Sequence, residues 1–387
     1  MKILHVLRAP VGGLFRHVVD LAHGQIARGH EVGIVADSCT AHVLSEQTLT
    51  ALAPKLALGL SRFRIWRQPG PADVGAVWHV ARRIHATGAE IVHGHGAKGG
   101  ALARLAPARH ALVRAYTPHG GSLHDAVGGC ICILMERALK RRGQLYLFES
   151  AYSHDVYRRK IGRPAGSVRI VHNGVRKDEC EAVALAAEAS DLVYLGEMRA
   201  LKGVGVLIEA LAHLRDSGRR LTATLIGDGP DAALFRAKAD ALGLGELVTF
   251  RKPMPTRKAL ALGRIVAVPS RAESLPYVVL EAAAAGKPLL ATKVGGIPEV
   301  FGPLAERLVR PDDVGALAAA VVDAVDRPDV TADAAQALRA RVQTVFSVDV
   351  MVDGVVNAYH HARALPKGQA NEEGRVADAA IERQLTM

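Results

Sequence analysis

The chain has 387 residues, of which 49% are hydrophobic and 22% charged; this is typical of a globular protein with two domains of about 180 to 200 residues. No uninterrupted apolar run reaches the roughly 18 residues that a membrane-spanning helix requires, and the apolar start is too short for a signal peptide. Aromatic residues make up only 4%, and no RNP, KH or zinc-finger pattern occurs, so we expect no nucleic-acid partner. The four cysteines form no CxxC pair, which predicts reduced thiols and a cytoplasmic location.

Positive charge is concentrated in the first half of the chain. Residues 1–180 contain 25 Lys and Arg against 12 Asp and Glu, a net charge of +13, whereas residues 181–387 contain 24 against 26, a net charge of −2. We expect the basic half to meet an anionic partner, such as an anionic membrane surface or a lipid-linked pyrophosphate. Contact of the arginine- and aromatic-rich segment 61–67 with nucleic acid, or simple solubility, would be alternative explanations.

The chain begins with a predicted strand at 2–7, a glycine-rich turn, a helix at 14–28 and a second strand at 29–35. Because glycine lets backbone amides approach a ligand closely, Gly12 and Gly13 are candidates for phosphate binding. Arg16 is predicted in the first turn of the helix, where a positive side chain opposes the helix dipole. We therefore expect an anion near this helix start.

Two later strands are predicted to end in histidine-containing loops. The sequence HGHGAKGG carries His93, His95 and Lys98, and PHGG carries His119. Since open α/β sheets bind ligands at the carboxyl ends of their strands, we expect these loops to line a cleft. His93 is also compatible with a packing role alone. The other elements predicted here are strands 111–117, 145–148 and 168–171 and helices 135–142 and 152–160.

The second half is predicted to start a new parallel sheet. Strand 192–195 is followed by a glycine turn that carries Arg199 and Lys202, and then by helix 204–214. Cations at such a corner can neutralise a diphosphate. Further elements are predicted as strands 223–226, 248–251, 265–269 and 288–292 and helices 231–242, 313–326, 332–345 and 347–364. We expect the tail 366–387 to be disordered.

The segment 271–300 carries the most specific pattern. Ser274 is predicted as the N-cap of an alanine-rich helix with Pro276 in its first turn. Glu273 then lies in the loop before this helix, and Glu281 about one turn inside it. The helix start can hold a phosphate, while the two carboxylates can accept hydrogen bonds from sugar hydroxyls. The alternative is an exposed Glu273 and a Glu281 that is merely paired with a basic neighbour.

Glu273 and Glu281, followed by AAAAGKPLLAT and VGGIPEV, resemble the E-x7-E signature of the family-four (group 1) retaining glycosyltransferases. The resemblance extends to the TPHG and HNGV sequences of the first half and covers nearly the whole chain. It implies a GT-B fold, an α/β architecture in which two Rossmann-like domains face each other across a cleft. It also implies retaining transfer of a sugar from a nucleotide-diphosphate sugar.

The resemblance implies catalytic roles for four residues. His119 is expected to face the transferred sugar and Glu273 to bind the sugar hydroxyls. Lys202 and Arg199 are expected to stabilise the leaving diphosphate. The sequence departs from the family at Glu197, which stands where the family usually has its arginine, so the role of Arg199 rests on a neighbouring position.

Binding roles follow in the same way, with Glu281 expected to hold the ribose hydroxyls. The expected donor contacts are Gly12, Gly13, Ser274, Leu275, Tyr277 and Glu281, and the expected acceptor-side residues are Arg16, His95 and Lys98. No DxD pair ends a strand, so we expect no metal and no cofactor besides the UDP-, GDP- or ADP-sugar donor.

We expect an acceptor-side domain at 1–178 with a crossing helix at 347–364, and a donor-binding domain at 190–346. The predicted enzyme is a hexosyltransferase that acts on a lipid-linked or cell-envelope polysaccharide precursor, at or near the inner face of the plasma membrane. A sugar-nucleotide epimerase or phosphorylase on the same fold and a non-catalytic sugar-nucleotide-binding protein are the alternatives. An NAD-dependent dehydrogenase is disfavoured because no GxGxxG follows the first strand of either half.

Overall fold

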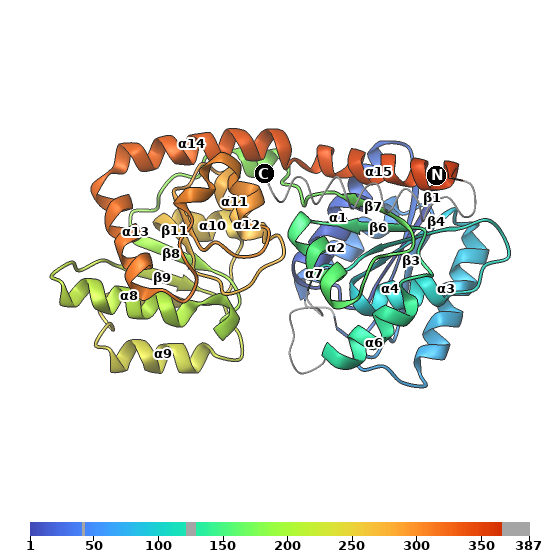
Figure 1. Ribbon diagram of the computed structural model, residues 1–387, viewed down its shortest axis with the longest axis horizontal. Coiled ribbons are helices and arrows are strands. Elements are labelled where there is room, and N and C mark those ends of the chain that lie inside the picture. Colours follow the sequence, from blue (N-terminus) through green and yellow to red (C-terminus); the bar gives the residue numbers. More distant parts are fainter. Residues whose placement is uncertain (41–42, 121–128, 366–387) are drawn as a thin grey trace. The chain divides into compact units, whose positions relative to one another are not determined.

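The structure, a computed structural model, describes residues 1–40, 43–120 and 129–365, without the side chains of residues 129–131. The predicted tail 366–387 lies outside these described residues. The chain forms two compact units: unit 1 is Met1–Asn173 with the segment from Val348 onward, and unit 2 is Gly174–Ser347. Each unit is a parallel-sheet α/β domain (Figure 1).

Unit 1 has a seven-stranded sheet in the order β3-β2-β1-β4-β5-β6-β7, and every pair in it is parallel. The strands are β1 (Lys2–Leu7), β2 (Glu31–Asp37), β3 (Gly59–Phe63), β4 (Ile91–His95), β5 (Val113–Thr117), β6 (Leu145–Phe148) and β7 (Ser167–Ile170). The helices are α1 (Gly12–Ala27), α2 (Val43–Leu52), α3 (Asp73–Thr87), α4 (Gly96–Leu105), α6 (Gly129–Leu139), α7 (Ala151–Lys160) and α15 (Val348–Ala364), with the short 3-10 helix η1 (Ala53–Lys55).

Helices cover both faces of this sheet because successive strand side chains point to opposite sides. Ile3 and Ile91 pack on one face against apolar side chains of α1 and α15. Leu4 and Val92, one residue further along the same strands, pack on the other face with α3 and α4. The largely apolar runs of β1 and β6 made these strands predictable, whereas β3 (GLSRF) has no such run and no strand was predicted there.

Unit 2 has a five-stranded parallel sheet in the order β10-β9-β8-β11-β12. Its strands are β8 (Ser190–Leu195), β9 (Ala223–Ile226), β10 (Val248–Arg251), β11 (Gly263–Val268) and β12 (Leu289–Ala291). Its α-helices are α8 (Val204–Asp216), α9 (Ala232–Ala241), α10 (Thr256–Ala261), α11 (Tyr277–Ala284), α12 (Ile297–Phe301), α13 (Val314–Asp326) and α14 (Pro328–Val345). Three short 3-10 helices complete it: η2 (Lys177–Cys180), η3 (Ala200–Lys202) and η4 (Gly302–Arg307).

The sheet of unit 2 is also covered on both faces, as Figure 1 shows. Leu192 and Tyr194 of β8 pack with α8, α9 and α13, whereas Val193 between them packs with α10, α11 and α14. The predicted bounds of β6, β9 and β10 are confirmed to the residue.

The prediction that the segment HGHGAKGG forms a loop is wrong. Strand β4 runs to His95 and α4 begins at the next residue, so Lys98 is helical. Its glycines allow close packing: a Cβ on Gly100 would come within 2.1 Å of the Tyr116 ring. The glycines here bring α4 against the sheet, and the sequence alone did not distinguish this use from a ligand-binding loop.

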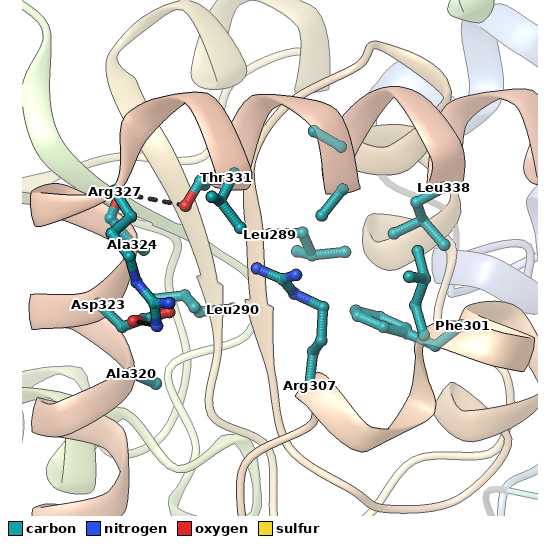
Figure 2. A pocket seen from close by; sticks show the side chains of 14 residues that line it. Leu289, Leu290, Phe301, Arg307, Ala320, Asp323, Ala324, Arg327, Thr331 and Leu338 are labelled. Atoms are coloured by element: carbon teal, nitrogen blue, oxygen red, sulfur yellow. Dashed lines mark hydrogen bonds and ion pairs between the residues drawn. The ribbon is translucent and has the colours of Figure 1, made fainter.

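A hollow of about 230 Å³ lies in unit 2 between β12, η4, α13 and α14 (Figure 2). Leu289, Phe301 and Leu338 form apolar parts of its wall, and Arg307 lies at its side. None of the predicted site residues lines it. Within the described part of the chain, no helix is both long and apolar enough to cross a bilayer.

Candidate active site

In unit 2 the order of the strands reverses between β8 and β11, and the segments after these two strands carry the predicted cation and carboxylate. The Lys202 ammonium donates a hydrogen bond of 2.6 Å to Oε1 of Glu273, although the two residues are 71 positions apart. The Ser270 hydroxyl donates to the same oxygen at 2.7 Å. Open parallel sheets bind ligands at such a reversal, outside the carboxyl ends of the strands. The fold thus places two of the predicted residues together where a ligand is expected.

The backbone of Glu273 is held by the glycine turn that follows β12. Gly295 has a φ of 59°, and a Cβ there would lie 1.9 Å from the carbonyl oxygen of Glu273. The amide of Gly296 donates to the carbonyl oxygen of Ser274 at 2.6 Å. Only glycine fits this approach, so the sequence VGG supports the position of the carboxylate.

Helix α11 starts later than predicted. Its N-cap is Pro276, in extended conformation and without a side-chain cap, and Tyr277 is its first residue. The prediction that Ser274 caps the helix, with Pro276 in the first turn, is therefore wrong. Leu275 is buried in the apolar core of unit 2, so only its backbone is suited to a ligand contact.

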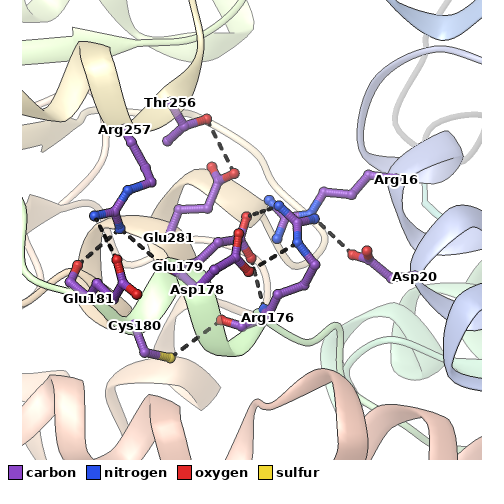
Figure 3. A network of polar contacts seen from close by, with 10 residues as sticks. All are labelled: Arg16, Asp20, Arg176, Asp178, Glu179, Cys180, Glu181, Thr256, Arg257 and Glu281. Atoms are coloured by element: carbon purple, nitrogen blue, oxygen red, sulfur yellow. Dashed lines mark hydrogen bonds and ion pairs between the residues drawn. The ribbon is translucent and has the colours of Figure 1, made fainter. Parts of the chain in front are cut away.

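Glu281 is the fifth residue of α11 and accepts a hydrogen bond of 3.2 Å from the Thr256 hydroxyl of α10 (Figure 3). The next residue of α10, Arg257, donates to the backbone carbonyls of Asp178 and Glu181. Helix α10 thus orients the second carboxylate of the E-x7-E pattern and also fixes the segment that follows the start of unit 2.

Arg199 immediately precedes η3 and is well exposed. Its Nε lies 3.7 Å from Oε1 of Glu197, the residue that occupies the usual arginine position of the family. Solvent screens exposed charges more strongly, so we expect Arg199, with 43% of its side chain exposed, to contribute less positive potential than Lys202, with 27% exposed.

Unit 1 has its own reversal of strand order, between β1 and β4, and histidines gather there. They come from β1, α1, β4 and the turn after β5: His5, His17, His93, His95 and His119. A continuous chain of hydrogen bonds runs from Gln25 Oε1 to His5 Nε2 (2.8 Å), from His5 Nδ1 to His95 Nε2 (2.9 Å) and from His95 Nδ1 to His119 Nε2 (3.1 Å). His119 has a φ of 56°, a left-handed conformation that is uncommon outside glycine.

These imidazoles are held neutral. Burial lowers the pKa of His5 and of His17 to about 4, and it lowers the pKa of His95 and of His119 well below the ordinary value. A neutral imidazole both donates and accepts hydrogen bonds, which suits contact with hydroxyl groups. No role was predicted for His5 or Gln25 from the sequence. The available signal was a polar residue inside the apolar strand KILHVL.

The other predicted residues of unit 1 are in different settings from those expected. Gly12 and Gly13 are the first two residues of α1, and the helix therefore starts before the predicted turn ends. Arg16 then lies beyond the first turn, which corrects its predicted place, and its Nε is 3.4 Å from Oδ2 of Asp20.

Lys98, predicted on the acceptor side, is held by α3. Its ammonium donates to Oδ2 of Asp73 at 2.6 Å and to the carbonyl oxygen of Gln68 at 3.1 Å. Its side chain is largely buried in this pair, so Lys98 anchors the start of α4 to α3.

Comparison with known proteins matches both units to described families. Residues 11–179 match "Glycosyltransferase Family 4" and residues 189–327 match "Glycosyl transferases group 1". Together these matches cover most of the chain. The chain belongs to the family-four, group 1 glycosyltransferases.

Curated relatives of this chain include two proteins named D-inositol 3-phosphate glycosyltransferase. The protein from Gordonia bronchialis is 31% identical over 226 residues, covering 55% of this chain and 49% of the relative. The protein from Jonesia denitrificans is 27% identical over 355 residues, covering 78% and 80%. The chain spans about half the length of the first of these relatives.

Solved structures with the GT-B fold resemble this chain over nearly its whole length. Sucrose-phosphate synthase from Thermosynechococcus elongatus aligns with a TM-score of 0.77 at 19% identity, covering 94% of this chain and 100% of the other. HepE from Anabaena, in complex with UDP and glucose, aligns with a TM-score of 0.77 at 20% identity, covering 93% and 100%. At this identity the likeness confirms the predicted fold class, and the roles of individual residues stay predictions.

Proposed function

We propose that the protein is a retaining glycosyltransferase that moves a hexose from a nucleotide-diphosphate sugar to an acceptor. The observation that carries the proposal is the 2.6 Å contact between the Lys202 ammonium and the Glu273 carboxylate at the strand-order reversal of unit 2. This pair offers a cation for a diphosphate and an acceptor for sugar hydroxyls at one ligand-binding edge. The family membership supports the same chemistry.

Catalysis would depend on charge at the leaving group. As the bond between the sugar and the diphosphate breaks, negative charge grows on the β-phosphate oxygen, and Lys202, assisted by Arg199, stabilises it. The amides of Gly12 and Gly13 contribute further donors to the phosphates. The acceptor hydroxyl attacks the anomeric carbon from the face that the diphosphate leaves, and it gives its proton to the departing diphosphate. The anomeric configuration is therefore retained.

Recognition of the donor falls to the carboxylates and to the start of α11. Glu273 accepts hydrogen bonds from the sugar hydroxyls and Glu281 from the ribose, while the backbone at Ser274, Leu275 and Tyr277 lies beside the donor. His119, a neutral imidazole, contacts the transferred sugar. We propose that transfer itself needs no metal, because cationic side chains take the place of an ion at the diphosphate.

We propose a UDP-sugar as donor and an anionic acceptor. The structure of HepE contains UDP and glucose, and the named relatives act on inositol 3-phosphate. The excess of positive charge in residues 1–180 favours a phosphorylated or lipid-linked acceptor, presented at the cytoplasmic face of an anionic membrane.

A melting-temperature panel with UDP-, GDP- and ADP-glucose tests donor binding, because a ligand that binds the folded state raises the melting temperature by mass action. We expect UDP-glucose to give the largest rise and Lys202→Ala to reduce it. The matched control is Lys238→Ala, which removes a lysine paired with Glu209 elsewhere in unit 2. A panel without any rise would contradict the proposed donor class.

Release of free nucleotide, measured with and without inositol phosphates or lipid extracts as acceptors, then separates the candidate enzymes. The proposal expects release that depends on an acceptor and an α-linked product from an α-linked donor, seen by NMR of the anomeric proton. Rapid release or sugar isomerisation without an acceptor would favour the epimerase. Tight donor binding with no product under any condition would favour a non-catalytic sugar-nucleotide-binding protein.

A further inference from the structure

Besides forming hydrogen bonds, the neutral histidines of unit 1 can act as metal ligands. We propose that His17, His95 and His119 form a binding site for a late first-row divalent metal ion such as Zn²⁺. One ligand nitrogen from each of the three lies within 4.8 Å of the other two. This site lies within unit 1, and its metal uptake can be measured whether or not the transfer reaction proposed above takes place. It shares the His119 ring with the sugar contact proposed above, so a bound metal would leave only Nδ1 of that ring for the sugar.

The hydrogen bonds determine which nitrogen each ring offers. The side-chain oxygen Oε1 of Gln25 can only accept, so His5 donates to it through Nε2. His5 then accepts at Nδ1 a hydrogen bond from Nε2 of His95. This leaves Nδ1 of His95 as a lone-pair atom. His17 Nδ1 lies 3.1 Å from Oδ1 of Asn173 and donates to it, which leaves Nε2 of His17 as its lone-pair atom. The third nitrogen is Nε2 of His119.

The spacing suits a small ion. Zinc binds imidazole nitrogen at 2.0–2.1 Å in a tetrahedral arrangement, which separates neighbouring ligand atoms by about 3.3 Å. Nδ1 of His95 and Nε2 of His119 are 3.1 Å apart, so a slight opening admits the ion. The proton on Nε2 of His119 moves to Nδ1 of the same ring, and the hydrogen bond between the two rings is exchanged for two metal–nitrogen bonds.

The surroundings of the three rings are those of a metal site. Metal-binding histidines usually donate their other ring N–H to an oxygen or to another acceptor, which orients the ring. His17 does so to Asn173, and His95 does so to His5, which is itself held by Gln25. Two of the three ligands are therefore already oriented by buried partners.

The chemistry of the ligands selects the class of metal. Three neutral imidazoles favour Zn²⁺, Cu²⁺, Ni²⁺ or Co²⁺ over the oxygen-seeking Mg²⁺ and Ca²⁺. Three protein ligands leave a fourth position for water or another small ligand.

A second set of three, His5, His93 and His95, fits less well although its ligand nitrogens are equally close. Both nitrogens of His93 already have hydroxyl partners, Tyr359 at 2.7 Å and Thr117 at 2.8 Å. Both nitrogens of His5 are also bonded, and all three rings are fully buried. A metal there would break several buried hydrogen bonds, whereas His119 is partly exposed and gives the first set a route to solvent.

The test is metal titration of the full-length protein after chelation and dialysis. We expect Co²⁺ to bind one per chain with the visible absorption of tetrahedral coordination, Zn²⁺ to displace it, and native mass spectrometry to count one ion. His17→Gln should abolish this uptake. Asn173→Ala should keep the ligands and weaken binding by about 10- to 100-fold, as expected for an outer partner.

His213→Gln is the matched control, because His213 is an exposed histidine of α8 in unit 2. It should bind metal like the unaltered protein, and circular dichroism should show that all variants are folded. Absence of one-to-one uptake by the unaltered protein would overturn the site. Equal uptake by a folded His17→Gln variant would do so too, because it would assign the metal to surface histidines.

Discussion

Unit 1 and unit 2 each have a parallel sheet whose strand order reverses between two central strands. They nevertheless distribute charge in opposite ways. At its reversal unit 1 presents buried, neutral histidines, although this half of the sequence carries the positive excess. Unit 2, nearly neutral in sum, presents the ion pair of Lys202 and Glu273 at the same point. The net charge of a domain therefore does not locate its charged site; the strand ends do.

Unit 1 also has a strong ion pair, but it is buried away from the strand-order reversal. Arg104 of α4 donates to Glu136 of α6 at 2.8 Å, and the side chains are 0% and 4% exposed. Tyr116 and Tyr157 donate to the same carboxylate. Burial next to this carboxylate raises the pKa of both tyrosines, which stay protonated donors. We expect charge to serve stability in unit 1 and ligand chemistry in unit 2.

Glu136→Ala should give the largest effect and tests the first half of this comparison. It leaves the guanidinium of Arg104 buried without its carboxylate, and we expect a loss of about 3–5 kcal/mol in the free energy of unfolding, measured in urea. Glu46→Ala, which removes the exposed partner of Arg62, is the control and should change little. A loss no greater than that of the control would show that the buried pair does not stabilise unit 1.

Lys202→Ala tests whether the charged pair of unit 2 serves ligand chemistry. Removing one cation from the leaving group should lower turnover by about 10²-fold or more, on the order of 3 kcal/mol of transition-state stabilisation. The melting temperature without ligand should stay close to that of the unaltered protein, since Lys202 is partly exposed. Near-normal turnover would remove Lys202 from the mechanism, and a large loss of stability would undo the contrast between the units.

Lys287→Met sharpens the comparison by removing a cation of unit 2 that lies in the interior. Lys287 is only 5% exposed, and burial lowers its pKa from 10.5 to about 8. At pH 7 it is charged in both the folded and the unfolded state, and its burial is unfavourable. Methionine should therefore raise the free energy of unfolding by on the order of 1–3 kcal/mol.

The lowered pKa of Lys287 also predicts how the stability difference between the two proteins changes with pH. Between pH 8 and 10.5 the unfolded chain binds more protons at Lys287 than the folded protein does, so the stability of the unaltered protein rises with pH. The advantage of Lys287→Met should shrink over this window in urea unfolding curves. The exposed Lys293→Met serves as control. An advantage that is constant from pH 7 to 10 would contradict a depressed pKa.

Arg199→Ala should have the smallest effect. Arg199 is more exposed than Lys202 and its charge is therefore more strongly screened by solvent, so we expect a fall in turnover of less than tenfold, about 1 kcal/mol. Glu197→Gln should slightly raise turnover, because it removes the competing charge. A loss from Arg199→Ala as large as that from Lys202→Ala would show that both cations bind the leaving group equally.

The sequence alone determined the parts of this protein that depend on neighbouring residues. Apolar runs gave the bounds of β6 and β9, because strands buried on both faces are recognisable from hydrophobicity alone. The spacing of Glu273 and Glu281, with the glycine turn that follows, indicated the family. Local errors occurred where one residue type has two uses: Gly100 allows close packing against Tyr116, and Ser274 does not cap α11.

Only the tertiary structure decided which distant side chains meet. His5 and His95 are 90 positions apart and meet because β1 pairs with β4 at the reversal of unit 1. The register sets His5 opposite His93, two residues before His95 on the same face. Arg104 and Glu136 meet through the packing of two helices. Such contacts depend on strand order, strand register and helix packing, which the residues next to each side chain do not specify. The sequence thus specified the strands and the family pattern, and the fold assembled the histidine cluster and the buried ion pair.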